Sequence, residues 1–182
     1  MIITTSKGRI IHEQSGELAG ASLRGLKLSG ADLEGANLVS TDFSGAVLVI
    51  ANFSDSDLFG ACFDDAFMAG AYLFSANLAG ASLRSADLYW AWLFMASCHH
   101  ADFTHASLTG ADLKECDFTD AILCGANLGR DNLGGSTSVQ GAIFTGAELG
   151  GVIWDRAEYD DATVFPAGFN PLKRGLLYKA NA

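Results

Sequence analysis

The stretch ADLEGANL at residues 31–38 contains the unit that determines the fold: a small, a polar and a large apolar residue, then two more before the unit restarts. From Leu18 to Leu133 a large apolar residue recurs at every fifth position, 24 in all, and the residue two places earlier is Ala in 18 of them. Helices repeat every ~3.6 residues and strands every ~2, so a period of five fits neither. It predicts a solenoid in which each unit forms one side of a coil.

These units resemble the A(D/N)Lxx consensus of the pentapeptide-repeat family, and the resemblance covers residues 16–165. Direct matches are Ala31-Asp32-Leu33, Ala36-Asn37-Leu38, Ala76-Asn77-Leu78, Ala86-Asp87-Leu88, Ala111-Asp112-Leu113 and Ala126-Asn127-Leu128. The resemblance implies an all-β fold, a right-handed quadrilateral parallel β-helix with four units per coil, whereas the period alone also permits a triangular coil. Residues 165–171 are similar to the closing segment of many cyanobacterial members.

The register of the repeat changes after Leu133. The next apolar positions are Val139, Phe144, Leu149, Trp154, Tyr159 and Val164. We expect one extra residue near 134–136, in a bulge or short loop. The 24 units before the break and the 6 after it give 30 units, or about 7.5 coils of a solenoid spanning residues 16–165.

Both ends of a solenoid expose unpaired strand groups and need caps. We assign residues 1–15 to an amino-terminal cap and residues 166–182 to a carboxy-terminal cap. Asn170 and Pro171 predict the start of a short helix. Leu172, Leu176 and Leu177 are the residues expected to pack onto the last coil.

Composition limits the compartment and the classes of partner. A net charge of −10 argues against nucleic acid as a partner, because phosphate binding needs a basic surface. No apolar run of about 18 residues predicts a transmembrane helix, so we expect no membrane partner. The amino terminus lacks the pattern of a secretory signal, although a processed form would look the same. Four cysteines without paired spacing favour free thiols in the cytoplasm.

Catalytic, metal and cofactor sites are not expected. His99, His100, Asp102 and His105 form the densest polar cluster, but their side chains point in different directions around a corner, which favours solvated surface over a metal site. The lumen is filled by Leu and Phe, which leaves no deep pocket. We predict that the protein is not an enzyme and carries no cofactor.

Residues 20 apart should stack on one side of the rod, and this converts the sequence into a surface map. One face and its adjoining corner collect apolar side chains, with Gly70 and Gly110 expected to flank Trp90. The predicted interaction residues are Val49, Ile50, Tyr72, Phe74, Tyr89, Trp90, Trp92, Phe94 and Met95. Exposed apolar patches of this kind tend to bind proteins. The alternatives are a patch covered by one of the caps, or cross-strand ladders that stabilise only the coil.

The function that follows is a non-catalytic scaffold that presents this aromatic surface to a protein partner or to a second copy of itself. The resemblance also implies an alternative, an acidic DNA mimic that modulates a topoisomerase such as gyrase. The charge and rod shape agree with that alternative. The columns agree less, because no two carboxylates stack directly in the columns that precede the apolar positions.

Overall fold

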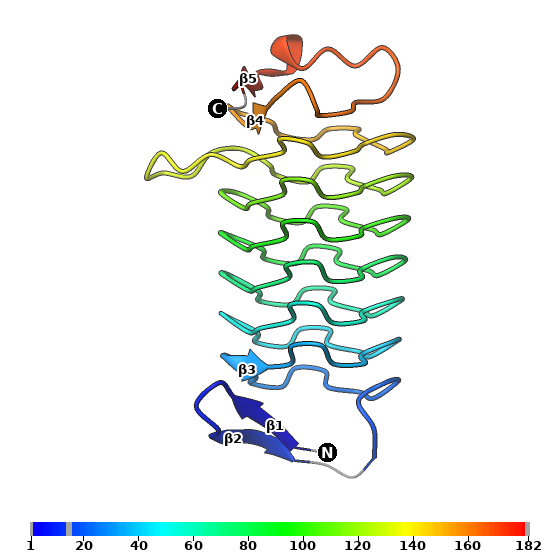
Figure 1. The fold of residues 1–182 in the computed structure, drawn as a ribbon, viewed down its shortest axis with the longest axis vertical. Helices are drawn as coiled ribbons and strands as arrows, with labels where there is room; N and C mark the ends of the chain where they lie inside the picture. Colours follow the sequence, from blue (N-terminus) through cyan, green and yellow to red (C-terminus); the bar gives the residue numbers. More distant parts are fainter. Residues whose placement is uncertain (1, 14–15, 181–182) are drawn as a thin grey trace.

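The computed structural model describes residues 2–13 and 16–180, which form a rod of stacked coils with a hairpin at one end and an irregular segment at the other (Figure 1). The regular elements are β1 (Ile2–Thr5), β2 (Ile10–Glu13), β3 (Ala31–Asp32), β4 (Glu158–Tyr159), the 3-10 helix η1 (Leu172–Arg174) and β5 (Leu177–Tyr178). Within the described residues no helix is both long and apolar enough to cross a membrane.

The coil is held by parallel bridges between residues 20 apart, from Ser22 with Asp42 to Ser107 with Asn127. Each bridge falls on the residue before a large apolar position. Because five-residue units occupy a 20-residue coil, each coil has four sides. A triangular coil would instead pair residues about 15 apart, so the period's ambiguity is resolved in favour of the quadrilateral.

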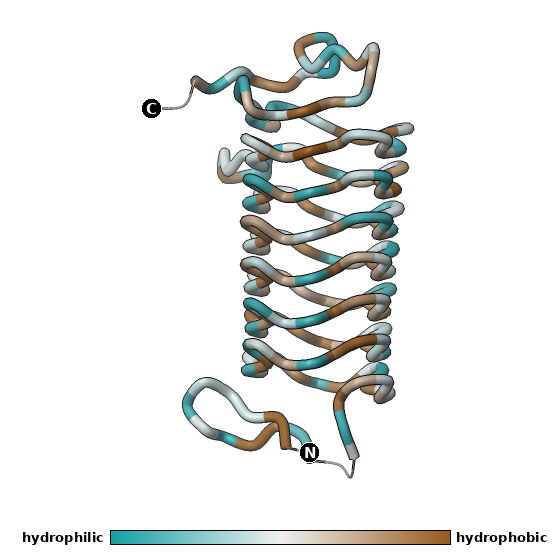
Figure 2. Tube along the Cα trace, turned by 45° about the vertical axis from the view of Figure 1, so that its right-hand side comes forward, coloured by the Kyte–Doolittle hydropathy of each residue, from teal (hydrophilic) through white to brown (hydrophobic). Residues whose placement is uncertain are grey.

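The lumen is a continuous apolar column. The rings of Phe43 and Phe63, one coil apart, stack 5.0 Å between centroids at 3°, and Phe53 meets both edge-on. Leu83 and Leu93 are fully buried in the same column. Apolar and polar segments alternate along every coil (Figure 2). The Leu or Phe of each unit therefore supplies the hydrophobic driving force, while Ala lets the chain turn the corner beside it.

Each corner is a tight turn, and the last residue of the five-residue unit, which lies in this turn, has a positive φ. Ala46 N–H, for example, donates to Phe43 C=O at 2.9 Å across Gly45, whose φ is 63°. Glycine adopts this conformation without steric cost, whereas other residues lose roughly 1–2 kcal/mol. Glycine at this position thus allows the backbone conformation of the turn. The presence of a large side chain there requires a different explanation.

The Asp or Asn of the unit also has a local role. Its Oδ1 accepts the backbone N–H two residues later, as in Asp42 with Ser44 (2.9 Å) and Asp102 with Thr104 (2.8 Å). This bond satisfies an N–H on the outer side of the coil that no neighbouring strand can reach. Short polar side chains that bond their own backbone in this way favour turns.

The register break differs from the prediction. Asp112 pairs with Ser138 and Asn127 with Ile153, each 26 residues apart, so the break adds six residues to the coil rather than one. A whole unit plus one residue leaves the coil, and its Leu133 is 87% exposed instead of filling the lumen. Residues 131–136, here called the insertion loop, project from the side of the rod (Figure 1). The sequence period alone could not distinguish an insertion of six residues from an insertion of one, because both shift a five-residue register by one position.

A second break follows near Asp160. Ile143 pairs with Val164, 21 residues apart, so the apolar position moves from Val164 to Phe165. Val164 is 44% exposed, whereas the Phe165 ring stacks on Phe144 at 5.6 Å. The prediction that Val164 fills the lumen is therefore wrong by one residue. Asp160 Oδ1 accepts the N–H groups of Gly141, Ala162 and Thr163 and holds the extra residue.

The two ends differ in how they close the rod. β1 pairs antiparallel with both β2 and β3, which covers the first coil with a hairpin and buries Ile3. At the other end η1 is a single turn, and β5 pairs parallel with β4. Leu176 is buried as expected, and Leu177 pairs with Glu158. Leu172 is 67% exposed and does not pack on the last coil.

Candidate interaction surface

Five of the predicted residues form a flat array that we call the aromatic face: Tyr72, Phe74, Trp92, Phe94 and Met95. Tyr72 and Trp92 are bridged across one coil step, with ring centroids 6.4 Å apart, and Phe74 lies 5.6 Å from Phe94. Both pairs stand nearly parallel at 23°. They point outward because they precede and follow the lumen residues Leu73 and Leu93 on the same coil side. Tyr72 and Trp92 are 45% and 50% exposed.

The other four predicted residues, Val49, Ile50, Tyr89 and Trp90, form the adjoining apolar corner. Ile50 and Trp90 occupy the left-handed turn position with φ values of 52° and 55°, as does Met95 on the aromatic face with 60°. A β-branched residue with positive φ is an outlier. Large apolar residues therefore occupy turn positions that glycine would adopt with less backbone strain. Their side chains are exposed, so burial in the core does not explain their presence.

The insertion loop is anchored to this corner through Asp131. Its Oδ2 accepts the indole N–H of Trp90 at 2.7 Å and the hydroxyl of Tyr89 at 3.2 Å. Its Oδ1 accepts the N–H groups of Leu133 (2.8 Å) and Gly135 (2.6 Å). Partial desolvation raises the pKa of Asp131, but these bonds outweigh it and hold the pKa below its ordinary value. The loop is therefore an ordered turn fastened to the coil by one carboxylate.

The surroundings of Trp90 correct one expectation. A Cβ at Gly110 would lie 2.8 Å from Trp90 Nε1, so the indole does lie against Gly110. A Cβ at Gly70 would instead meet Ile50, at 3.3 Å from Cγ2. Trp90 leans toward the carboxy-terminal neighbour alone, because Asp131 attracts its N–H to that side.

The amino-terminal hairpin borders the surface without covering it. The turn of the amino-terminal hairpin lines a shallow groove of about 470 Å³ whose wall includes Ser6, Gly30, Ile50 and Tyr72. Tyr72 and Trp92 remain about half exposed with both described ends in place. Neither the Tyr72 hydroxyl nor the Trp92 indole N–H has a hydrogen-bond partner among the described residues, in contrast with Tyr89 and Trp90.

Sequence reasoning missed one member of the patch. Phe67 is 53% exposed and is bridged to Val47, beside the apolar corner. It is the single aromatic residue in a column that also holds Lys27 and Asp87, so it did not stand out. The signal that identifies it is the neighbouring column, where Val49 and Tyr89 continue the same apolar side.

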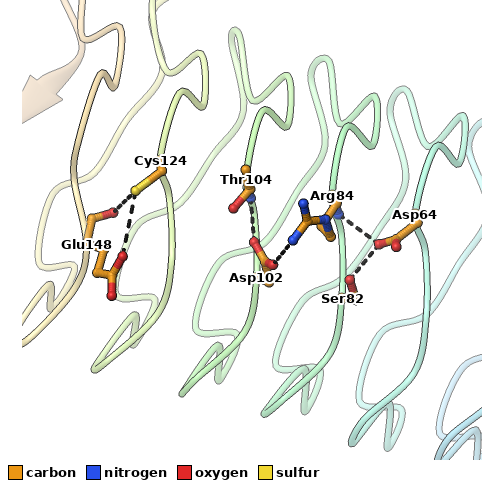
Figure 3. Close-up of polar contacts among 7 residues, drawn as sticks. All are labelled: Asp64, Ser82, Arg84, Asp102, Thr104, Cys124 and Glu148. Atoms are coloured by element: carbon orange, nitrogen blue, oxygen red, sulfur yellow. Dashed lines mark hydrogen bonds and ion pairs between the residues drawn. The ribbon is translucent and has the colours of Figure 1, made fainter.

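The opposite face is polar and satisfied from within (Figure 3). Ser82 Oγ donates to Asp64 at 2.5 Å, and Arg84 Nη1 meets Asp102 Oδ2 at 2.9 Å on the next coil. Such contacts join residues 18 apart, as does the ion pair of Arg24 with Asp42. We call this row the polar ladder. Its ion pairs give Arg24 and Arg84 an internal partner, and hydrogen bonds do the same for Asp64.

His99 and the two buried cysteines take structural positions. His99 Nε2 lies 3.2 Å from Asp117, and no group of three or more metal-binding side chains gathers within residues 2–13 and 16–180. Cys98 and Cys116 are fully buried, and burial raises the pKa of both thiols. Neither thiol can readily become the thiolate that nucleophilic chemistry needs.

Comparison with protein families agrees with the repeat. The model for pentapeptide repeats matches 8 copies over residues 17–49, 51–89 and 96–130. The chain belongs to the pentapeptide-repeat family. Its members fold as right-handed quadrilateral β-helices, the architecture that the 20-residue pairing shows here.

Several solved pentapeptide-repeat structures are similar to this chain. HetL from Nostoc sp. strain PCC 7120, involved in heterocyst differentiation regulation, is 27% identical over 90% of this chain and 84% of its own, with a TM-score of 0.46. Another Nostoc PCC 7120 member is 33% identical over 62% and 84%, with a TM-score of 0.37. QnrB1, a plasmid-mediated fluoroquinolone resistance protein, is 17% identical over 89% and 84%, with a TM-score of 0.42. No curated protein matches significantly.

Proposed function

We propose that this pentapeptide-repeat protein is a non-catalytic scaffold that binds a protein partner through the aromatic face. The observation that carries the proposal is the array of Tyr72, Phe74, Trp92 and Met95, each between 42% and 50% exposed on a rigid coil. Trp and Tyr dominate the energetic centres of protein interfaces. A rigid array also loses little conformational entropy on binding.

The size of the array fits the centre of an interface. An aromatic side chain has roughly 150–250 Å² to bury, so four or five about half exposed offer ~400 Å². A standard interface buries about 800 Å² on each partner. The aromatic face therefore supplies about half of one side, and its polar surroundings would supply the rest.

The unused polar groups point the same way. Tyr and Trp usually find a hydrogen-bond partner when they are buried. Asp131 supplies that partner for Tyr89 and Trp90, whereas Tyr72 and Trp92 keep a free hydroxyl and a free N–H among the described residues. A partner protein that covers the face can accept both.

The test is a capture experiment with a matched control. We expect Tyr72→Ser with Trp92→Ser to abolish capture of a partner from an extract of the source cells. Phe59→Ser should retain it, because Phe59 is equally exposed (54%) but lies on the adjoining side of the coil, outside the aromatic face. The captured protein is then purified and titrated against all three forms. Equal binding by the double variant and the wild type contradicts the proposal.

The acidic DNA mimic has one observation in its favour, the net charge of −10. The columns work against it. Asn52 donates to Asp32 at 3.4 Å and Asn77 to Asp57 at 2.9 Å, so amides separate the carboxylates along the rod. A row of phosphates has no such interruptions. A gyrase supercoiling assay discriminates the two, since a scaffold of this kind should leave supercoiling unchanged.

A further inference from the structure

We infer that the partner of the aromatic face has an apolar centre and a margin rich in lysine or arginine, and that a second copy of this chain is not its occupant. This inference rests on the proposed function and adds the chemistry of the partner. It follows from the charges around the face, which we call the border. The border consists of Asp32, Glu34, Asp55, Asp112, Lys114 and Glu115.

The coil geometry places these charges on the side of the rod that carries the rings, one coil beyond them toward the carboxy terminus and one or two coils beyond them toward the amino terminus. The column of Tyr72 and Trp92 continues through Asn52 to Asp32 on one side and to Asp112 on the other. Asp55 N–H donates to Phe74 C=O at 2.8 Å, and Met95 N–H donates to Lys114 C=O at 3.0 Å. The border therefore surrounds the face on both sides along the rod.

Five carboxylates and one ammonium give the border a net charge of −4. Lys114 is already held by Asp112 at 3.5 Å, so its charge is partly used. Among the described residues, the carboxylates of Asp32 and Glu34 accept hydrogen bonds only from the side-chain amide of Asn52, and neither Asp55 nor Glu115 forms an ion pair. On the opposite face, Arg24 and Arg84 neutralise the carboxylates beside them.

A net negative charge on the coil side that carries an apolar centre selects the partner. Two copies meeting through this face would bring border against border, and like charges ~4 Å apart repel by about 1 kcal/mol even in water and by more at an interface. A partner with Lys or Arg at its margin instead gains attraction and a faster approach. Because the rings fill only about half of a standard interface, these charges must lie within the contact.

The test uses two synthetic helical peptides of about 18 residues with an identical Leu and Phe stripe, one flanked by Lys and the other by Glu. Binding is measured by titration calorimetry with the whole chain. The border variant carries Asp32→Asn, Asp55→Asn, Glu34→Gln and Glu115→Gln. The control variant removes as many charges elsewhere, with Asp65→Asn, Asp120→Asn, Glu17→Gln and Glu148→Gln. Thermal unfolding establishes that both variants fold.

We expect the wild type to bind the Lys peptide at least about tenfold more tightly than the Glu peptide, and the border variant to lose that preference. The control variant should keep most of it. Equal binding of both peptides, equal losses in both variants, no binding of either peptide, or a dimer that depends on Tyr72 and Trp92 would each overturn the inference. If the two peptides bind equally and the double variant Tyr72→Ser, Trp92→Ser still binds both more weakly than the wild type, only the inference about the partner's charge fails. If that double variant binds as the wild type does, the proposed function fails as well.

Discussion

The polar ladder and the aromatic face lie on opposite sides of the same coils, and they differ in where their side chains find partners. On the ladder, Arg84 reaches Asp102 on the next coil at 2.9 Å, and Asp102 in turn accepts the N–H of Thr104. On the aromatic face, Tyr72 and Trp92 stack on each other but leave their polar groups unused within the described chain. The side chains of one side bind one another, whereas the other side leaves two polar groups without a partner among the described residues.

The difference is confined to the outward positions of the coil. The lumen beneath both faces is the same, since Leu83 under the ladder and Leu93 under the aromatic face are both fully buried. Backbone bridges join neighbouring coils on both sides, as in Ser82 with Asp102 and Trp92 with Asp112. The outward positions are therefore free to differ, with ion pairs between coils on one side and stacked rings between coils on the other.

The largest expected effect tests whether the two sides share one core. Leu83→Ala and Leu93→Ala should each lower the free energy of unfolding by about 3–5 kcal/mol, because each leaves a cavity in a tightly filled column. The two losses should agree within about 1 kcal/mol, measured by denaturant unfolding. A much smaller loss at Leu93 would mean that the core under the aromatic face is looser, and the comparison of surfaces would need a different basis.

A smaller effect separates a ladder acid from a border acid. Asp102→Ala should cost about 1–2 kcal/mol of unfolding free energy, because Thr104 N–H and Arg84 lose their acceptor. Glu115→Ala should cost under ~0.5 kcal/mol, since no ion pair of the described chain uses Glu115. Denaturant unfolding at neutral pH measures both. A loss at Glu115 as large as that at Asp102 would show that the border is also satisfied internally.

Asp102 also predicts how the free energy of unfolding changes at acidic pH. Desolvation raises the pKa of Asp102, but hydrogen bonds from Thr104 and Arg84 outweigh it and lower the pKa overall. A group whose pKa is lowered by folding stabilises the folded state at pH values above its ordinary pKa. That contribution disappears as the pH falls through the pKa of the folded state. Wild-type stability should therefore fall more steeply below about pH 4 than that of Asp102→Asn. Identical pH profiles would remove the ladder's electrostatic role.

A third change should stabilise the fold while impairing the surface. Ile50 stands in a left-handed conformation with φ 52°, and Ile50→Gly should raise the free energy of unfolding by ~0.5–1 kcal/mol. The reverse change at the ladder side, Gly45→Ala, places a Cβ at φ 63° and should cost about 1 kcal/mol. Thermal unfolding of the two variants measures both signs. Destabilisation by Ile50→Gly would mean that the packing of Ile50 over Gly70 matters more than its strain.

The sequence predicted the regular coils well because their signal is local and repeated. Leu33, Phe43 and Leu48 are buried as their five-residue spacing requires, and the columns 20 apart are the observed bridges. The nine residues assigned to the interaction surface lie together for the same reason. Their role in binding stays a prediction, as do the limits given to the two caps.

The breaks could not be predicted because their evidence is not periodic. Leu133 fits the spacing and yet leaves the coil, since the alternative register lets Thr137 bond Leu108 C=O and Gly129 C=O inside the corner. The role of Asp131 in anchoring the loop was equally invisible, because Trp90 lies 41 residues away in sequence. One signal was available in retrospect. An Asp at the small inward position is too polar for the lumen unless several donors surround it.

The smallest expected effect concerns Asp131, which anchors the insertion loop to the apolar corner. The corner is intermediate between the two faces, because its side chains are apolar but their polar groups have an internal partner. Asp131→Asn should keep Oδ1 as the acceptor for Leu133 and Gly135, but it replaces Oδ2 with an NH2 group that cannot accept from Trp90. The turn should therefore survive while the indole N–H of Trp90 is released. The measurement is hydrogen exchange of the indole N–H groups by NMR, with Trp90→Phe assigning the signal.

In the wild type, the Trp90 signal should exchange slowly and the Trp92 signal quickly, since only Trp90 has an acceptor among the described residues. In Asp131→Asn the two should exchange alike. Because hydrogen bonds hold the pKa of Asp131 below its ordinary value, protection of Trp90 in the wild type should persist at neutral pH and be lost only as the pH falls below about 4. Protection of Trp90 that survives in Asp131→Asn would show that packing against Gly110 and Gly135, and not the carboxylate, fixes the indole. The corner would then belong with the self-sufficient side of the molecule, and the open surface would reduce to the aromatic face alone.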